Sequence, residues 1–114
     1  MPKQFQNATA QFRTSSHQLK IETGRHQNIP AEQRLCDYCN SSDIDDEVHM
    51  LIKCEYHDIE RRSFFSSLPS IMQSDIISDS NRFRSVMTSK DKEIVYKLAY
   101  FIHKCFQKRK QINN

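Results

Sequence analysis

The spacing of three cysteines and one histidine constrains this chain more than any other feature. Cys36, Cys39, His49 and Cys54 form the pattern C-x2-C-x9-H-x4-C. Three thiolates and one imidazole complete the tetrahedron of a structural zinc site, and they leave no coordination position for a catalytic water. The motif therefore predicts one structural Zn²⁺ that stabilises the fold and takes no part in hydrolysis.

Two other interpretations of these residues stay open at this point. The cysteines could be free core residues or disulfide partners. His57 could also replace one of the four ligands, although a site that used it would leave Cys54 unexplained. Cys105, the fourth cysteine, lies on the apolar side of a predicted helix, so we expect it in the core and not at the metal.

Chain length and composition indicate the fold class. A chain of 114 residues can bury only a modest core, so a metal ion would add much to its stability. One Gly, three Pro and no Trp favour helices joined by short turns. We predict a mainly α, small zinc-stapled domain spanning residues 1–114. It would comprise a basic N-terminal segment (1–35), the CCHC zinc module (36–54) and a helical remainder (55–110).

Hydrophobic spacing and capping residues place the first helices. The pattern predicts helices over residues 4–13 and 16–23, with Gly24 as the C-cap of the second. Asn28-Ile29-Pro30 should then break the chain. A further helix is expected from about residue 48 to 67, with an acidic cluster before its start and a break near Cys54.

The second half of the chain contains the clearest periodicity. Pro69 is expected to open a short helix, and residues 78–81 are expected to form a loop and cap. The spacing of apolar residues over 90–110 predicts a long amphipathic helix. We expect this helix to pack onto the metal module and to supply most of the core through Ile94, Leu98, Phe101, Ile102 and Phe106.

Charge is distributed unevenly along the sequence. Residues 36–60 carry one basic and eight acidic side chains, whereas residues 1–35 carry five basic and two acidic ones. Residues 90–114 carry seven basic and two acidic side chains. The acidic metal segment, including Asp45 and Asp46, should therefore face away from phosphate, and any nucleic acid should contact the flanks. The flanking charges are equally consistent with the solvated faces of helices.

Several stretches share a pattern with one known family. They are residues 12–25 (FRTSSHQLKIETGR), 34–39 (RLCDYC) and 46–54 (DEVHMLIKC), followed by 56–62 and 98–106. Together they resemble the C-terminal zinc-knuckle region of non-LTR (LINE-type) retrotransposon reverse transcriptases. The specificity of the resemblance lies in the combination of an arginine-bearing E-x-G-R segment, the CCHC pattern and Asp-Glu-x-His.

The resemblance implies an accessory tail that contacts template RNA or target DNA, with the body of a reverse transcriptase as a possible partner. It implies the same four metal ligands, and it implies nucleic-acid contacts from the N-terminal basic residues. The charge pattern adds the basic residues of the last helix. The predicted nucleic-acid-binding residues are Arg13, Lys20, Arg25, Arg34, Lys104, Lys108, Arg109 and Lys110.

The chain departs from that family in what it lacks. It contains no Tyr/Phe-x-Asp-Asp polymerase motif, no endonuclease signature and no long preceding domain, so we expect a non-enzymatic detached tail or an inactive retroelement remnant, with no small-molecule substrate. The alternative function is a protein-interaction module that zinc only folds. The polar N-terminus and the absence of a long apolar run predict an intracellular protein, in the nucleus or cytoplasm, without a membrane partner.

Overall fold

The computed structural model describes residues 2–13, 19–69 and 78–112. Within these ranges the backbone forms helices and loops, and the β pairing is limited to one isolated antiparallel bridge between Leu35 and Ile44. The mainly α fold is therefore confirmed. The helix that the sequence predicts after Pro69 lies outside the described residues.

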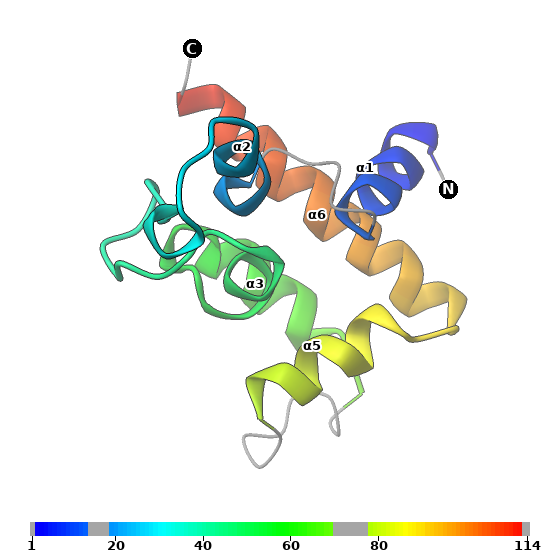
Figure 1. Cartoon of the computed structure of the whole chain (residues 1–114). Helices are drawn as coiled ribbons and strands as arrows, with labels where there is room; N and C mark the ends of the chain where they lie inside the picture. The colour runs from blue at the N-terminus through cyan, green and yellow to red at the C-terminus, as the bar shows by residue number, and fades with distance from the viewer. Residues whose placement is uncertain (1, 14–18, 70–77, 113–114) are drawn as a thin grey trace.

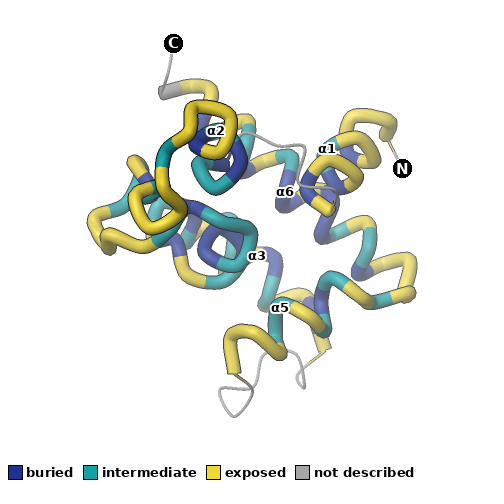
Figure 2. The backbone as a smooth tube through the Cα atoms, in the orientation of Figure 1, coloured by how far each residue is buried: buried dark blue, intermediate teal, exposed yellow. Residues whose placement is uncertain are grey.

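The longest helix, α6 (Lys92–Ile112), organises the fold (Figure 1). Its residues agree closely with the predicted helix, and its main neighbours are α1 (Lys3–Arg13) and α3 (Asp58–Ser66). In Figure 2, dark-blue stretches of buried residues recur along α6. The sequence predicted that α6 packs onto the metal module; its most extensive contacts are instead with α1 and α3, although Met50 and Leu51 of that module join the same core cluster. The core residues that α6 supplies are Ile94, Leu98, Phe101, Ile102 and Cys105.

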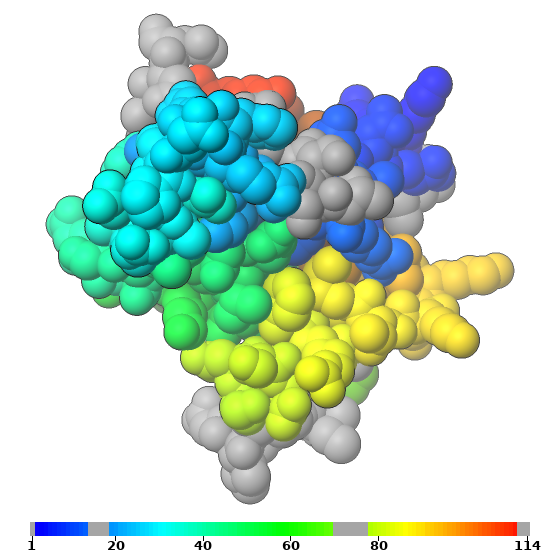
Figure 3. Space-filling model, viewed as in Figure 1, coloured from blue at the N-terminus to red at the C-terminus, as the bar shows by residue number. Residues whose placement is uncertain are grey.

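The other described elements are short. They are α2 (Lys20–His26), the 3₁₀ turns η1 (Ala31–Gln33) and η3 (Glu55–His57), the π turn η2 (His49–Lys53), and α5 (Asp79–Met87). On the face shown in Figure 3, the segments from α2 to α5 hide most of α6. None of the described helices combines the length and the apolar character needed to cross a membrane.

Helix α5 is absent from the sequence prediction. Residues 78–81 were expected as a loop and cap, and only the cap is confirmed: the Ser78 hydroxyl accepts a hydrogen bond from the Asn81 amide at 3.2 Å. Residues 79–81 already belong to the helix. Val86 is the buried residue of α5, so its apolar stripe is too short for periodicity to detect.

The end of α2 differs from its prediction. Gly24 lies inside the helix, and Asn28 adopts the left-handed conformation (φ 59°) that ends it. The amide of Ile29 donates to the Gly24 carbonyl at 2.9 Å, and that of Asn28 donates to the Arg25 carbonyl at 3.2 Å. These two bonds define a Schellman motif with asparagine at its left-handed position. The predicted chain break at residues 28–30 is thus confirmed, and the expected capping role of Gly24 is wrong.

Gly24 has a packing role instead. A Cβ atom at this position would lie 2.6 Å from Cγ and 2.9 Å from Cδ of Arg34. Arg34 cannot easily move, because its Nε donates to the Ile29 carbonyl at 2.8 Å and its Nη1 to the Ile21 carbonyl at 2.9 Å. The missing side chain of Gly24 therefore lets Arg34 cross α2 and fix the segment that leads into the metal loop.

We predict that Gly24→Ala lowers the free energy of unfolding by about 1 kcal/mol in urea denaturation. Overpacking costs about 1–3 kcal/mol, and removal of a glycine from a helix returns about 0.5–1 kcal/mol. In an Arg34→Ala background the clash is absent, so the same change should stabilise the protein. Equal stabilisation in both backgrounds would contradict this account of Gly24.

Candidate metal centre

A short hairpin brings the first two cysteines together. The Cys36 amide donates to the Asp43 carbonyl at 2.9 Å, and the Asp45 amide donates to the Arg34 carbonyl at 2.9 Å. Between these bonds the chain reverses, with Ser42 in the left-handed region at φ 61°. The backbone thus presents Cys36 and Cys39 from one tight loop.

The other two candidate ligands lie at the two ends of a π turn. Residues five apart on an α-helix point about 140° away from each other, so a regular helix would separate His49 from Cys54. In η2 the Cys54 amide instead donates to the His49 carbonyl at 2.7 Å, and the wider turn lets both side chains face the cysteine loop. The predicted break at Cys54 is confirmed. Asp46 begins this turn by accepting a hydrogen bond from the His49 amide at 2.8 Å.

The four predicted ligands converge. Their ligand atoms all lie within 4.8 Å of one another and could hold one metal ion. The Sγ atoms of Cys36 and Cys54 are 3.8 Å apart, and Cys39 Sγ lies 3.4 Å from His49 Nε2. All four cysteines of the chain are free, so the disulfide interpretation is wrong.

Polar groups surround the four ligands. The Tyr38 amide donates to Cys36 Sγ at 3.4 Å, and the Ser41 hydroxyl lies 3.1 Å from Cys39 Sγ. His49 Nδ1 is buried without a hydrogen bond and lies 3.7 Å from an Asp43 carboxylate oxygen. A histidine that ligates a metal through Nε2 commonly directs Nδ1–H at a carboxylate, so Asp43 is placed to orient the ring.

The electrostatics of the cluster also suit a cation. The Cys54 thiol, and after it His49, hold the pKa of Cys36 at about 3 in spite of its burial. The resulting Cys36 thiolate raises the pKa of Cys54, and hydrogen bonding to Cys36 raises that of His49. Without an ion, ionisation of one thiol therefore opposes ionisation of the next. A divalent cation among them would remove this conflict.

One arginine clamps the carbonyl end of η2. Arg61 of α3 donates to the carbonyls of Met50 at 3.0 Å, Leu51 at 3.0 Å and Cys54 at 2.7 Å, and it pairs with Asp58 at 2.7 Å. These bonds satisfy carbonyls that the π turn leaves without helical partners. Arg61 thus connects the metal loop to α3. No motif in the sequence indicated this role.

A buried ion pair connects the same loop to α6. Both terminal nitrogens of Arg109 donate to the Asp45 carboxylate, each at 3.0 Å, and the two side chains are 6% and 1% exposed. Burial works against the charge of Arg109, but Asp45 outweighs it and raises the pKa of the guanidinium. Asp45 Oδ2 also accepts the Lys20 amide at 2.9 Å. Asp45 is therefore a buried structural residue, which the grouping of Asp45 with Asp46 in the acidic metal segment did not indicate.

His57 belongs to this ion pair and not to the metal. Its Nε2 accepts a hydrogen bond from Arg109 Nε at 3.0 Å, and it is not among the four converging ligands. Burial, followed by the charges of Arg109 and Lys108, lowers the pKa of His57 to about 3. The ring is therefore neutral and acts as an acceptor. The alternative of His57 as a ligand is wrong.

Three predicted nucleic-acid residues form contacts within the fold. Arg109 is buried in its pair with Asp45, and Arg34 is half-buried between two carbonyls of the α2 segment. Lys108 is also half-buried: Nζ donates to the Tyr56 carbonyl at 2.6 Å and pairs with Glu60 at 3.2 Å. These contacts occupy the charged groups of Arg34 and Arg109, so we remove both from the predicted nucleic-acid surface.

The other predicted residues lie nearer to solvent. Lys20 forms an exposed pair with Asp37 at 2.6 Å, Arg25 pairs with Glu22 one turn away, and Arg13 donates to the Met87 carbonyl at 3.2 Å. Lys104 and Lys110 of α6 are exposed, and no described carboxylate forms a salt bridge with either. The structure therefore spreads these side chains over several elements and does not gather them into one cluster.

Comparisons of the chain with known protein families, with curated proteins and with solved structures found no match.

We predict that Asp45→Ala costs about 3–5 kcal/mol of unfolding free energy, because it leaves the Arg109 charge buried without a partner. The matched control is Asp37→Ala, which breaks the exposed pair with Lys20 and should cost less than about 1 kcal/mol. Urea denaturation of the metal-loaded proteins measures both. A cost for Asp45→Ala no larger than that for Asp37→Ala would contradict the structural role of the buried pair.

Proposed function

We propose that the ion bound by Cys36, Cys39, His49 and Cys54 is Zn²⁺. Tetrahedral zinc with Zn–S bonds of about 2.3 Å and Zn–N bonds of about 2.0 Å holds sulfur atoms about 3.8 Å apart and sulfur–nitrogen pairs about 3.5 Å apart. The separations of 3.8 Å for Cys36–Cys54 and 3.4 Å for Cys39–His49 fit these edges. Four protein ligands close the coordination shell, so the role of the ion is structural.

Metal analysis of the purified protein should find one equivalent of zinc. Cys39→Ser should abolish stoichiometric binding and reduce the far-ultraviolet circular dichroism of the helices, because structural zinc contributes on the order of 10 kcal/mol to folding. Cys105→Ser is the matched control, since Cys105 is buried in the core away from the cluster. Full retention of zinc by Cys39→Ser would rule out this ligand set.

We further propose that the zinc-folded domain binds nucleic acid and is not an enzyme. The observation that carries this proposal is the charge of α6, on which exposed lysines, among them Lys104 and Lys110, have no carboxylate partner in the described part of the chain. Lysines on one helix attract phosphate by releasing counterions. The metal segment is acidic, so we expect phosphate to contact the exposed lysines of α6 and not that segment.

The resemblance to the tail of LINE-type reverse transcriptases agrees with this proposal, and in that setting the domain would be an accessory that holds template RNA or target DNA. The rival function is docking onto a protein such as a polymerase body. Salt separates the two, because only phosphate binding requires a steep fall of affinity with added salt.

The test is the affinity of the zinc-loaded protein for a labelled duplex, measured by fluorescence anisotropy over a range of salt concentrations. We expect a linear fall of log K with log salt, and a slope that shrinks by about 0.9 for each phosphate contact removed. The combined change Lys104→Gln and Lys110→Gln should reduce the slope by about 1.8 and weaken all sequences alike.

The acidic control is Glu55→Gln, which lies on the exposed surface of the metal segment. It should leave binding unchanged or tighten it. Asp45 and Asp46 are unsuitable controls, because the first is buried against Arg109 and the second caps η2. An affinity and salt slope unchanged by the two lysine substitutions would overturn the phosphate-binding surface and favour the protein-docking function.

A further inference from the structure

A groove runs along α6 on the side where α3 lies. It encloses about 760 Å³ between the two helices, and the buried rings of Phe64 and Phe101, stacked at 5.2 Å, lie at its base. Three large apolar side chains stand exposed in the described structure: Ile59 at 72%, Tyr96 at 43% and Tyr100 at 45%. All three line this groove. The other large apolar side chains of the described structure are less exposed than these three. A group of exposed apolar side chains in a groove is typical of a binding site.

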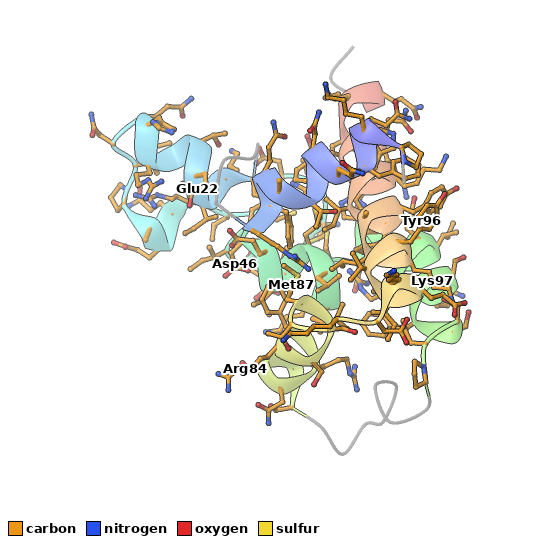
Figure 4. The ribbon with its side chains drawn as sticks, turned by 90° about the vertical axis from the view of Figure 1, so that its right-hand side faces the viewer. Glu22, Asp46, Arg84, Met87, Tyr96 and Lys97 are labelled. Carbon is orange, nitrogen blue, oxygen red and sulfur yellow. The ribbon has the colours of Figure 1, made fainter. Side chains whose placement is uncertain are left out.

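A buried residue of α1 supports the rings of Tyr96 and Tyr100. Phe5 of α1 meets the rings of Tyr96 and Tyr100 edge to face, with centroid distances of 5.9 and 5.5 Å. Phe5 is itself buried, so α1 fixes both rings on the wall of the groove. Figure 4 shows Tyr96 and its neighbour Lys97 on α6. The rings are therefore preorganised for stacking.

Lysines follow the same wall. Lys104 lies over the Tyr100 ring at 5.6 Å, and Lys97 and Lys108 flank the groove on either side of it. Glu60 is the acidic residue in the lining, and Lys108 pairs with it. Lys97 pairs in turn with Glu93 at 3.0 Å, so Lys104 is the lysine of the lining that has no salt-bridge partner among the described residues. Its charge lies beside the Tyr100 ring.

This combination fits single-stranded nucleic acid better than a protein. Bases stack on aromatic rings while lysines hold the phosphates, whereas protein interfaces are depleted in lysine, glutamate and serine at their centre. The row from Tyr96 to Lys108 extends about 18 Å at 1.5 Å per residue, the length of about five stacked nucleotides. Paired bases cannot stack on the rings, so the occupant must be unpaired.

We propose that the α3–α6 groove binds unpaired nucleotides, with bases stacked on Tyr100 and Tyr96 and phosphates contacted by Lys104. This inference rests on the proposed nucleic-acid function and adds to it the binding surface and the preference for single strands. It predicts that the protein binds a single-stranded oligonucleotide more tightly than a duplex of the same length.

The experiment compares a labelled 12-nucleotide oligothymidylate with a 12-base-pair duplex, using fluorescence anisotropy and zinc-loaded protein. Tyr100→Ala should weaken binding of the single strand by about 5- to 150-fold and leave duplex affinity within about twofold. Tyr100→Phe keeps the ring and should bind the single strand as the wild type does. Circular dichroism of each variant checks that loss of the contact with Phe5 does not unfold the domain.

A second variant tests the groove while keeping both tyrosine rings. Lys104→Gln should lower the salt slope for the single strand by about 0.7. Lys53→Gln, an exposed lysine of η2 outside the groove, removes the same charge and should leave the slope unchanged. Equal effects of the two substitutions would overturn the groove, because they would reflect net charge alone.

The outcomes separate this inference from the function on which it rests. Wild-type protein that binds neither oligonucleotide would overturn the nucleic-acid function and the groove together. Wild-type protein that binds both, with Tyr100→Ala binding the single strand equally well, would overturn the groove and leave the nucleic-acid function standing.

Discussion

The buried pair between Asp45 and Arg109 is the interaction on which the arrangement of the molecule depends. Asp45 belongs to the metal loop, accepts the backbone amide of Lys20 at the start of α2, and accepts two bonds from the last turns of α6. A buried ion pair contributes little net free energy to folding, because desolvation of the two charges offsets their attraction. Removal of one partner is costly, because the other charge is then buried alone. We infer that the value of the pair lies in orientation, since it specifies where α6 ends relative to the metal loop.

The metal centre and this pair support each other. The loop from residue 36 to 54 contributes Met50 and Leu51 to the main core, and Ile52 packs against that core. A metal ion would close the loop, Arg61 fixes its carbonyl end to α3, and Asp45 fixes it to α6. The metal loop is thus connected to both of the helices that border the α3–α6 groove.

Sequence reasoning succeeded where the physical cause is local. The four metal ligands are set by spacing, and α6 by a 3.6-residue period, so both could be read along the chain. Gly24 and Asn28 both suit a helix end, and the choice between them depends on Arg34, which approaches Gly24 only in the folded protein. Arg109 was read as part of a basic run, although its spacing from Ile102 and Cys105 places it on the buried side of the helix.

The basic run 108–110 shows that consecutive charged residues of a helix point to different sides. Successive residues turn by about 100°, so Lys108, Arg109 and Lys110 must point in three directions. Lys108 turns toward Tyr56, Arg109 enters the fold, and Lys110 remains exposed. A surface for phosphate must instead form along one side of α6, at intervals of three or four residues. Tyr96, Tyr100, Lys104 and Lys108 have that spacing, which is why the groove beside α3, and not the run at the end of the helix, is the stronger candidate for recognition.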